Sequence, residues 1–316
     1  PTSSFRFTFI SLTDAEREKF VMLSQWGDAG WFGSVYGMFA GCSKLQITAT
    51  DIPNFSNVAN MERMFAGCTA LNTVPNMNSW DVSKVNSMYL MFAGATNFNQ
   101  DIGNWNTSKV TNMGSMFNGA KAFNQNIGSW NVSNVTDMEY MFWNATNFNQ
   151  NIGNWNVSKA SMKQMFLNAA AFNQNLGNWQ LKNGTELGFD NSGMDCQNFS
   201  KTLYGWAQNV NTGSVVKLTA LGRKYGIAAQ SYRDKLVQLK GWTITGDSYD
   251  SNCTVQLAVA ENENDIFLIS PNPTNGIFNV RSKRKEEIGI YNSAGQIIKK
   301  KNLQEEDNRI DISYYT

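Results

Sequence analysis

The sequence contains no histidine and only four cysteines. Histidine is the commonest general base and metal ligand in proteins, so its absence removes the usual route to both kinds of chemistry. The cysteines lack the spacing of a zinc site, and the chain has neither a Gly-x-x-x-x-Gly-Lys phosphate loop nor a Gly-x-Ser-x-Gly nucleophile elbow. Asp and Glu are scattered and follow no period. We therefore expect a protein that is not an enzyme and that holds no metal or cofactor.

Charged residues and long apolar runs are also scarce. Asp, Glu, Lys and Arg make up 16% of the chain and the formal net charge is +1, so the composition does not indicate nucleic acid binding. No run of about 18 apolar residues is present, and we expect no transmembrane segment. The chain does not begin with a basic stretch and an apolar core, as a signal peptide would. If the protein is exported, we expect Pro1 to follow a removed signal peptide or an artificial chain start.

The sequence contains tandem repeats. Residues 113–130 and 138–155 match at almost every apolar position. Tryptophans occur at positions 80, 105, 130, 155 and 179, and the phenylalanine of a Met-Phe pair occurs at 39, 65, 92, 117, 142 and 166. A fixed period in the twenties is the signature of a solenoid, in which each coil buries its apolar side against its neighbours.

Within one copy, the pattern changes from helical to extended. Apolar residues recur at helical spacing after Ser108. They are Val110, Met113, Met116, Phe117 and Ala120. Residues 129–133 then alternate between polar and apolar, as in a strand with one buried side. The predicted fold class is an α/β repeat solenoid similar to leucine-rich repeats, with short parallel strands, helical turns and a period of about 25, followed by a small all-β C-terminal module.

Polar residues keep the same register as the apolar ones. Asn-Gln pairs stand at 99–100, 124–125, 149–150 and 173–174. Stacked amides can form hydrogen bonds from coil to coil and satisfy backbone groups at a turn. We favour this structural role for them over ligand binding.

The repeat also resembles a known family. The pattern Met-x-x-Met-Phe-x-x-Ala-x-x-Phe-Asn-Gln-x-Ile-x-x-Trp-Asn-Val-Ser is similar to that of the BspA-like leucine-rich-repeat surface proteins of bacteria, closely over residues 88–179 and loosely over 35–80. The resemblance implies a surface-exposed, adhesive protein whose partner is a glycan or an extracellular protein.

The C-terminal part resembles a second family. Pro-Asn-Pro-x-x-Gly at 271–276 and Tyr-Asn-x-x-Gly-Gln-x-Ile at 291–298 are similar to elements of the C-terminal sorting domain of the type IX secretion system. The resemblance implies export by that machinery across the outer membrane of a Gram-negative bacterium, followed by attachment to the cell surface or release. The family module usually continues through a Gly-x-Tyr strand to a basic end, whereas this chain stops at Thr316, so we expect a partial module.

These patterns divide the chain into five segments. We predict an N-terminal cap at 1–34, the tandem repeats at 35–182, a C-terminal cap at 183–247, a linker at 248–264 and the partial sorting domain at 265–316. Cys196 and Cys253 flank the C-terminal cap and are either a disulfide bond or two free thiols. Cys42 and Cys68 stand where later copies have alanine, and we expect small core residues there.

The predicted function is recognition of a glycan or protein through one face of the solenoid. If the tryptophans point inward, nine polar residues on neighbouring coils point outward, and we call this set the Asn/Ser ribbon. It consists of Asn104, Asn106, Ser108, Ser129, Asn131, Ser133, Asn154, Asn156 and Ser158. Amides and hydroxyls in a row suit a polar ligand that is held by many weak hydrogen bonds. The alternatives are a spacer or surface-layer scaffold without a ligand, and an exposed tryptophan column that stacks on sugars.

Overall fold

The computed structural model describes residues 11–27, 30–257, 268–270, 277–282, 286–291, 297–304 and 306–311. The chain divides into two units, Pro1–Leu257 and Ala258–Thr316. This division lies inside the range that the sequence predicts as a linker. The last residues of the predicted sorting domain, at 312–316, lie outside the described residues.

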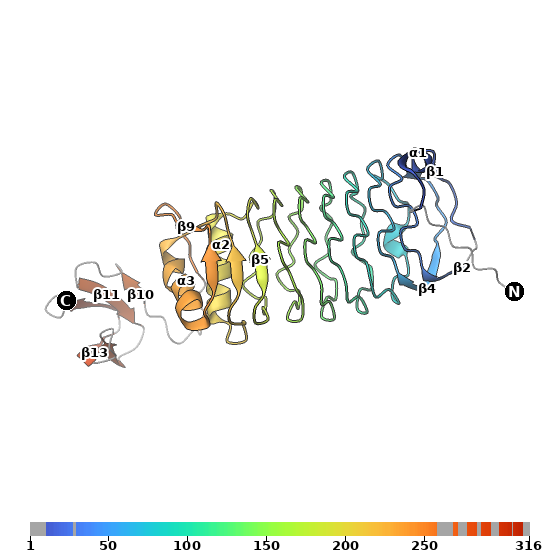
Figure 1. The fold of residues 1–316 in the computed structure, drawn as a ribbon. Coiled ribbons are helices and arrows are strands. Elements are labelled where there is room, and N and C mark those ends of the chain that lie inside the picture. Colours follow the sequence, from blue (N-terminus) through green and yellow to red (C-terminus); the bar gives the residue numbers. More distant parts are fainter. Residues whose placement is uncertain are drawn as a thin grey trace. The chain divides into compact units, whose positions relative to one another are not determined.

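The first unit begins with short elements that lead into the repeats. Helix α1 (Asp14–Arg17) is closed by a capping box in which Thr13 and Glu16 bind each other's backbone N–H groups. Strand β1 (Met22–Leu23) pairs in parallel with β3 (Gln46–Ile47), and β2 (Gly30–Ser34) pairs in parallel with β4 (Asn54–Asn60). One turn of 3-10 helix, η1 (Met77–Ser79), follows. From there to β5 (Glu186–Gly188), the chain forms similar coils that lie side by side (Figure 1).

Each coil is bonded to the next along its Met-Phe segment. Parallel bridges join equivalent residues of successive coils: Asn60 to Ser87, Ser87 to Asn112, Asn112 to Asp137, and Asp137 to Ser161. Beyond each bridge, alternate backbone N–H groups donate to the following coil, as those of residues 113, 115, 117 and 119 do to carbonyls of residues 137, 139, 141 and 143 at 2.7–3.0 Å. The intervening N–H groups of residues 116, 118 and 120 close turns within the coil, bonding to the carbonyls three residues back.

This alternation corrects the predicted helix at 110–120 and the predicted strand at 129–133. Residues 110–120 consist mainly of turns, and residues 129–133 form an irregular segment between two turns. Ser115 and Gly119 have φ angles of 53° and 70°, and a left-handed residue every few positions breaks an α-helix. The same two positions are left-handed in the neighbouring coils, at Leu90 and Gly94 and at Tyr140 and Asn144. Successive three-residue turns bring a side chain to the inside at nearly the same spacing as a helix does, which explains the wrong prediction.

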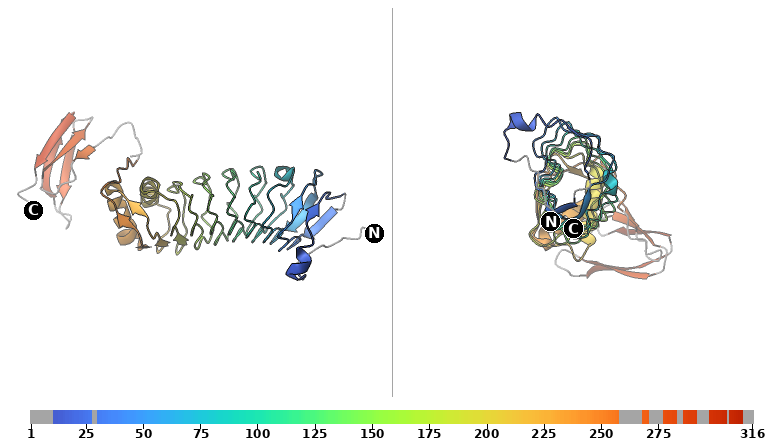
Figure 2. Two further views of the ribbon diagram at one scale, coloured as in Figure 1. Left: turned by 90° about the horizontal axis from the view of Figure 1, so that it is seen from above. Right: turned by 90° about the vertical axis from the view of Figure 1, so that its right-hand side faces the viewer.

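Aromatic side chains form continuous columns inside the stack. Ring centroids lie 5.7 Å apart between Phe92 and Phe117 and 5.8 Å apart between Phe117 and Phe142. The rings of Trp105 and Trp130 are 6.3 Å apart and nearly parallel, and each tryptophan is 3% exposed. The indole N–H of Trp130 donates to the carbonyl of Ile102. The regularly spaced tryptophans at 80, 105, 130, 155 and 179 are therefore core residues, which excludes the sugar-stacking column. Figure 2 shows that the coils enclose one interior along the length of the unit.

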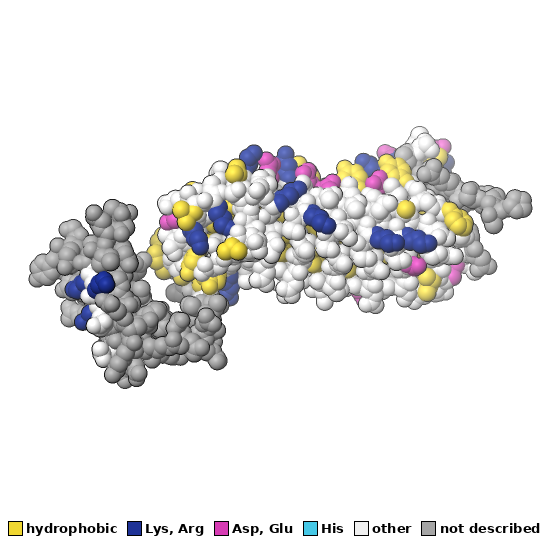
Figure 3. Space-filling model, turned by 90° about the horizontal axis from the view of Figure 1, so that it is seen from below, with side chains coloured by type: hydrophobic (Ala, Val, Ile, Leu, Met, Phe, Trp, Pro, Cys, Tyr) yellow, Lys and Arg dark blue, Asp and Glu magenta, His cyan; other side chains and the backbone are white. Residues whose placement is uncertain are grey.

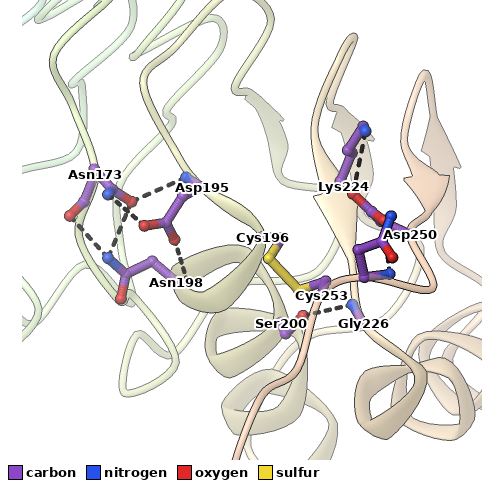
Figure 4. The surroundings of a disulfide bond; sticks show 10 residues. Asn173, Asp195, Cys196, Asn198, Ser200, Lys224, Gly226, Asp250 and Cys253 are labelled. Atoms are coloured by element: carbon purple, nitrogen blue, oxygen red, sulfur yellow. Dashed lines mark hydrogen bonds and ion pairs between the residues drawn. A yellow bond between two sulfur atoms is a disulfide. The ribbon is translucent and has the colours of Figure 1, made fainter.

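An amide ladder runs along the outside of the coils, as the Asn-Gln pairs predict. Asn99 Oδ1 accepts hydrogen bonds from the backbone of Asn124 and from Gln125 Nε2. The same bonds recur from Asn124 to the next coil and from Asn149 to the one after it. The ladder ends on helix α2 (Cys196–Gln208), where Asp195 and Asn198 bind Asn173 (Figure 4).

The last coils carry helices that close the stack. Strands β5, β6 (Lys217–Thr219) and β8 (Thr243–Thr245) form a parallel sheet. Helix α2 packs against α3 (Ile227–Lys240), and β7 (Lys224–Tyr225) pairs with β9 (Ser248–Tyr249). A disulfide bond joins Cys196 at the start of α2 to Cys253, with Cα atoms 6.1 Å apart (Figure 4).

The described residues of the second unit form two antiparallel sheets. Strand β11 (Ile277–Ser282) lies between β10 (Leu268–Ser270) and β14 (Glu306–Asp311). Strand β12 (Glu286–Tyr291) pairs with β13 (Ile297–Leu303). The strands β10 and β11 flank the Pro- and Gly-rich segment at 271–276, which itself lies outside the described residues.

The left-handed turns predict opposite effects for two substitutions in one coil. Gly119→Ala should lower the free energy of unfolding by about 1 kcal/mol because its φ is positive. A Cβ there would meet Gly94 Cα at an ordinary 3.7 Å, so crowding is not the cause. Ser115→Gly should raise the free energy of unfolding by up to about 1 kcal/mol. Urea unfolding of both variants tests this. A helical segment would give the reverse, since Ala stabilises a helix and Gly weakens it.

The disulfide bond predicts a redox-dependent stability of the C-terminal cap. Replacing both Cys196 and Cys253 by serine should cost about 2–4 kcal/mol, because the bond closes a long loop in the unfolded chain. The fluorescence of Trp206 and Trp242, which are buried in this cap, reports its unfolding. A reductant should weaken the wild-type protein by a similar amount and leave the double variant unchanged. Equal unfolding of the wild-type protein with and without reductant would contradict the prediction.

Candidate functional site

The Asn/Ser ribbon is built from one turn that recurs in successive coils. In it, an Asn side chain accepts hydrogen bonds from the backbone and hydroxyl of the Ser two residues later. Asn106 Oδ1 lies 3.2 Å from the Ser108 backbone N and 2.7 Å from Ser108 Oγ. Asn131 binds Ser133 and Asn156 binds Ser158 in the same way. The repeated turn therefore presents the same residue types on each of these coils.

The ribbon residues all lie at the surface, and neighbouring coils are bonded through them. Six are exposed, namely Asn104, Asn106, Ser129, Asn131, Asn154 and Asn156, and the serines at 108, 133 and 158 are half-buried. Ser129 Oγ donates to the carbonyl of Gly103, and Thr107 Oγ1 donates to that of Asn131. These bonds hold adjacent coils in register at the ribbon.

The turn also decides which atoms of the ribbon remain available. Each turn asparagine has its Oδ1 engaged by the following serine, as described above. Within the part of the chain that the structure describes, the Nδ2 groups of Asn106, Asn131 and Asn156 donate to no protein acceptor. The ribbon therefore offers a row of outward amide donors. The sequence predicts that these residues lie on the surface. It does not predict that the amide oxygen closes the turn while the amide nitrogen faces outward.

Asp81 occupies the position of these asparagines in an earlier coil. Its Oδ1 accepts the backbone N–H of Ser83 at 3.0 Å. Hydrogen bonds from the side chain and backbone of Ser83, aided by Lys84, hold the pKa of the Asp81 carboxyl below its ordinary value of 3.8. A carboxylate thus performs the same turn-closing role as an amide.

Sequence reasoning missed a set of basic residues beside the ribbon, which we call the lysine line. It consists of Lys84, Lys109 and Lys159, and each is exposed at the position three residues after the turn Asp or Asn. Asn134 takes this position in the coil between Lys109 and Lys159. Figure 3 shows a line of Lys and Arg side chains along the stack of coils. The signal in the sequence was the shared register of these lysines.

A second surface lies over the Met-Phe segments and differs from coil to coil. The two residues between the methionines are Tyr89 and Leu90 in one coil, Gly114 and Ser115 in the next, and Glu139 and Tyr140 in the third. The ring of Tyr140 lies 5.6 Å from that of Trp143. Acidic residues of the repeats also lie in this register, at positions 62, 137, 139 and 186. Arg63 and Lys163 lie in the same register, and Lys163 Nζ is 4.0 Å from Glu186 Oε2, so this surface carries charges of both signs.

The metal-binding and thiol groups of the described residues can be surveyed directly. They contain no group of three or more His, Cys, Asp or Glu that could hold a metal ion. Cys42 and Cys68 are fully buried free thiols, as predicted for core positions. Burial raises the pKa of Cys42 to about 11 and also raises that of Cys68, so neither is a thiolate at neutral pH. None of the helices in this part of the chain has the length and hydrophobicity needed to span a bilayer.

Comparison with protein families identifies two regions. The family described as "Mycoplasma protein of unknown function, DUF285" matches residues 33–145 and 102–206, which together span more than half of the chain. The chain therefore belongs to the DUF285 family. The secretion system C-terminal sorting domain matches residues 268–316, which confirms the predicted sorting domain and points to secretion and attachment at the cell surface. No curated protein and no solved structure matches the chain. The resemblance to BspA-like proteins stays a prediction.

The lowered pKa of Asp81 predicts an acid-dependent effect of Asp81→Asn. The folded pKa lies below 3.8, so the carboxylate contributes stability above that pH and loses it as the pH falls through the folded pKa. The variant keeps the turn without titrating. Its melting temperature relative to wild type should therefore rise below about pH 4, by an amount that corresponds to less than about 1 kcal/mol because the group is mostly exposed. A constant difference between pH 7 and pH 2 would contradict this.

Proposed function

We propose that this DUF285 family member is a non-enzymatic recognition protein, displayed on or released from the surface of a Gram-negative bacterium. Its repeats act as a solenoid of the leucine-rich-repeat kind, and the Asn/Ser ribbon binds a glycan or an extracellular protein. The type IX secretion machinery exports it through the C-terminal sorting domain. The sorting domain match and the membership of DUF285 support the location of the protein.

One observation supports the Asn/Ser ribbon as the binding face. The same exposed turn, with its outward Asn Nδ2 group, recurs at residues 106, 131 and 156 on coils that are locked to each other. Equivalent donors on such coils lie about one strand spacing apart, near 4.8 Å. A polymer with repeated acceptor groups can engage several of them at once, and the rigid backbone reduces the entropy that binding costs. Many weak contacts then add up to useful affinity.

A scaffold without a ligand is the competing function. It is favoured by the observation that the ribbon asparagines already have a structural role, since their side-chain oxygens close the turns. In this case, the outward amides would be a by-product of the turn. A ligand screen with substitutions that leave the turns intact separates the two functions.

The screen uses the full chain on an array of glycans and extracellular proteins. Asn104→Trp combined with Asn154→Trp places bulky groups on the ribbon, and neither side chain forms a turn bond within the described residues. We expect this double variant to lose at least about 90% of binding to any hit, which corresponds to about 1.4 kcal/mol. Asn147→Trp is the matched control, because Asn147 is exposed but lies outside the ribbon.

Retention of binding by the double variant would contradict the ribbon as the binding face. Equal loss with Asn147→Trp would do the same. If the array produces no hit and purified protein assembles side by side, the scaffold function is supported instead.

A further inference from the structure

The lysine line is held in place by one recurring turn. The backbone N–H of the residue after each lysine-line position donates to a carbonyl three residues earlier. This bond is 2.9 Å long in each of the pairs Val85–Val82, Val110–Thr107, Val135–Val132 and Ala160–Val157. Lys84, Lys109, Asn134 and Lys159 therefore occupy the same corner of successive coils. Their spacing along the stack is that of the coils, about 4.8 Å.

Lys109 and Lys159 have no ion pair with a carboxylate among the described residues, whereas the charge of Lys84 helps to lower the pKa of the Asp81 carboxyl. Lys84 Nζ contacts Asn57 Oδ1 at 2.8 Å, and Lys159 Nζ contacts Asn134 Oδ1 at 3.1 Å. These acceptors are uncharged amides. No ion pair in the described part of the chain includes a residue of the lysine line, whereas Lys44, Lys163, Lys217 and Lys224 each lie near a carboxylate. The positive charges of Lys109 and Lys159 are therefore available to a ligand.

Amide donors lie beside this charge. In each turn, the asparagine precedes the lysine-line position by three residues, and its Nδ2 group faces outward because Oδ1 is engaged by serine. Asp81 is the one carboxylate among the four turn residues at 81, 106, 131 and 156. The combined surface is rich in donors and positively charged, so it suits a ligand that is negative and rich in acceptors.

We propose that the lysine line and the neighbouring ribbon amides bind an extended anionic polysaccharide, with its carboxylate or sulfate groups at the lysines and its hydroxyl and ring oxygens at the Asn Nδ2 groups. The inference rests on the proposed recognition function and names the class of ligand. A linear polymer that repeats its charge can follow the stack from coil to coil.

Two other classes of partner fit this surface less well. Single-stranded nucleic acid is usually held by aromatic side chains that stack on bases, but Trp105, Trp130 and Trp155 in these coils are 3% exposed. Protein interfaces depend on buried Trp, Tyr and Arg anchors, and the ribbon and the lysine line contain none of these residues in exposed positions. A hydrated, negatively charged polymer requires neither feature.

The test measures binding of the full chain to immobilised dextran sulfate and polygalacturonate, with neutral dextran as the uncharged probe. We expect binding to both anionic polymers, weakening as salt is raised because exposed charges are screened. Lys109→Gln with Lys159→Gln should weaken binding about three- to tenfold, as expected for two exposed charge contacts. Asn134→Lys should strengthen it, because this substitution fills the gap in the line.

The matched control is Lys121→Gln with Lys163→Gln, which changes the net charge equally but lies outside the lysine line and the ribbon. We expect this control to keep its affinity within about twofold. Circular dichroism melting checks that each variant is folded. An equal loss with the control variant, or no loss with Lys109→Gln and Lys159→Gln, would overturn the proposal.

Two other outcomes would overturn the proposed ligand class. Binding of single-stranded DNA as tightly as the anionic polysaccharides would overturn the choice of polysaccharide. Absence of binding to both anionic polymers at low salt would overturn the inference. If the same protein then binds a neutral glycan or a protein on the array through the ribbon, the proposed recognition function holds although the inferred anionic ligand is wrong.

Discussion

Backbone hydrogen bonds between neighbouring coils are the constraint on which the repeats depend. Along each Met-Phe segment, every second N–H donates to the next coil while the others close turns within their own. This arrangement satisfies both sets of backbone donors without an α-helix or a long strand. It also forces residues at the same repeat position to lie next to each other. The aromatic columns, the amide ladder and the Asn/Ser ribbon are consequences of this register.

Much of the interior could be predicted from the sequence, because burial depends on the period alone. The spacing of Phe117 and Phe142, or of Trp105 and Trp130, is enough to place them in columns. The local backbone could not be predicted. Turns of three residues and a helix place apolar side chains at similar intervals, and left-handed positions such as Leu90 and Tyr140 carry residues that rarely adopt this conformation. The strand prediction at 129–133 was wrong because an irregular segment between two turns produces the same alternation of buried and exposed residues.

The surface position of the Asn/Ser ribbon could be predicted, but its hydrogen bonds and the lysine line beside it could not. Outward positions follow from inward ones, so the sequence located the Asn/Ser ribbon. The use of each asparagine oxygen by the following serine depends on the turn geometry, which a pattern of residue types does not specify. The lysine line was missed because only uncharged positions of the repeats were compared between copies. Once Lys109 and Lys159 are placed on stacked coils, with Asn134 between them, they form part of one surface.

The repeats depend most directly on the hydrogen bonds between coils, and residue-resolved amide hydrogen exchange tests these bonds. We expect strong protection from exchange at the N–H groups that donate to the next coil, such as those of Leu90, Phe92, Ser115 and Phe117. These groups should become exposed only when neighbouring coils open together. The backbone N–H groups of exposed corners such as Lys109 should exchange much faster. Fast exchange at the inter-coil donors, or independent opening of single coils, would contradict the account.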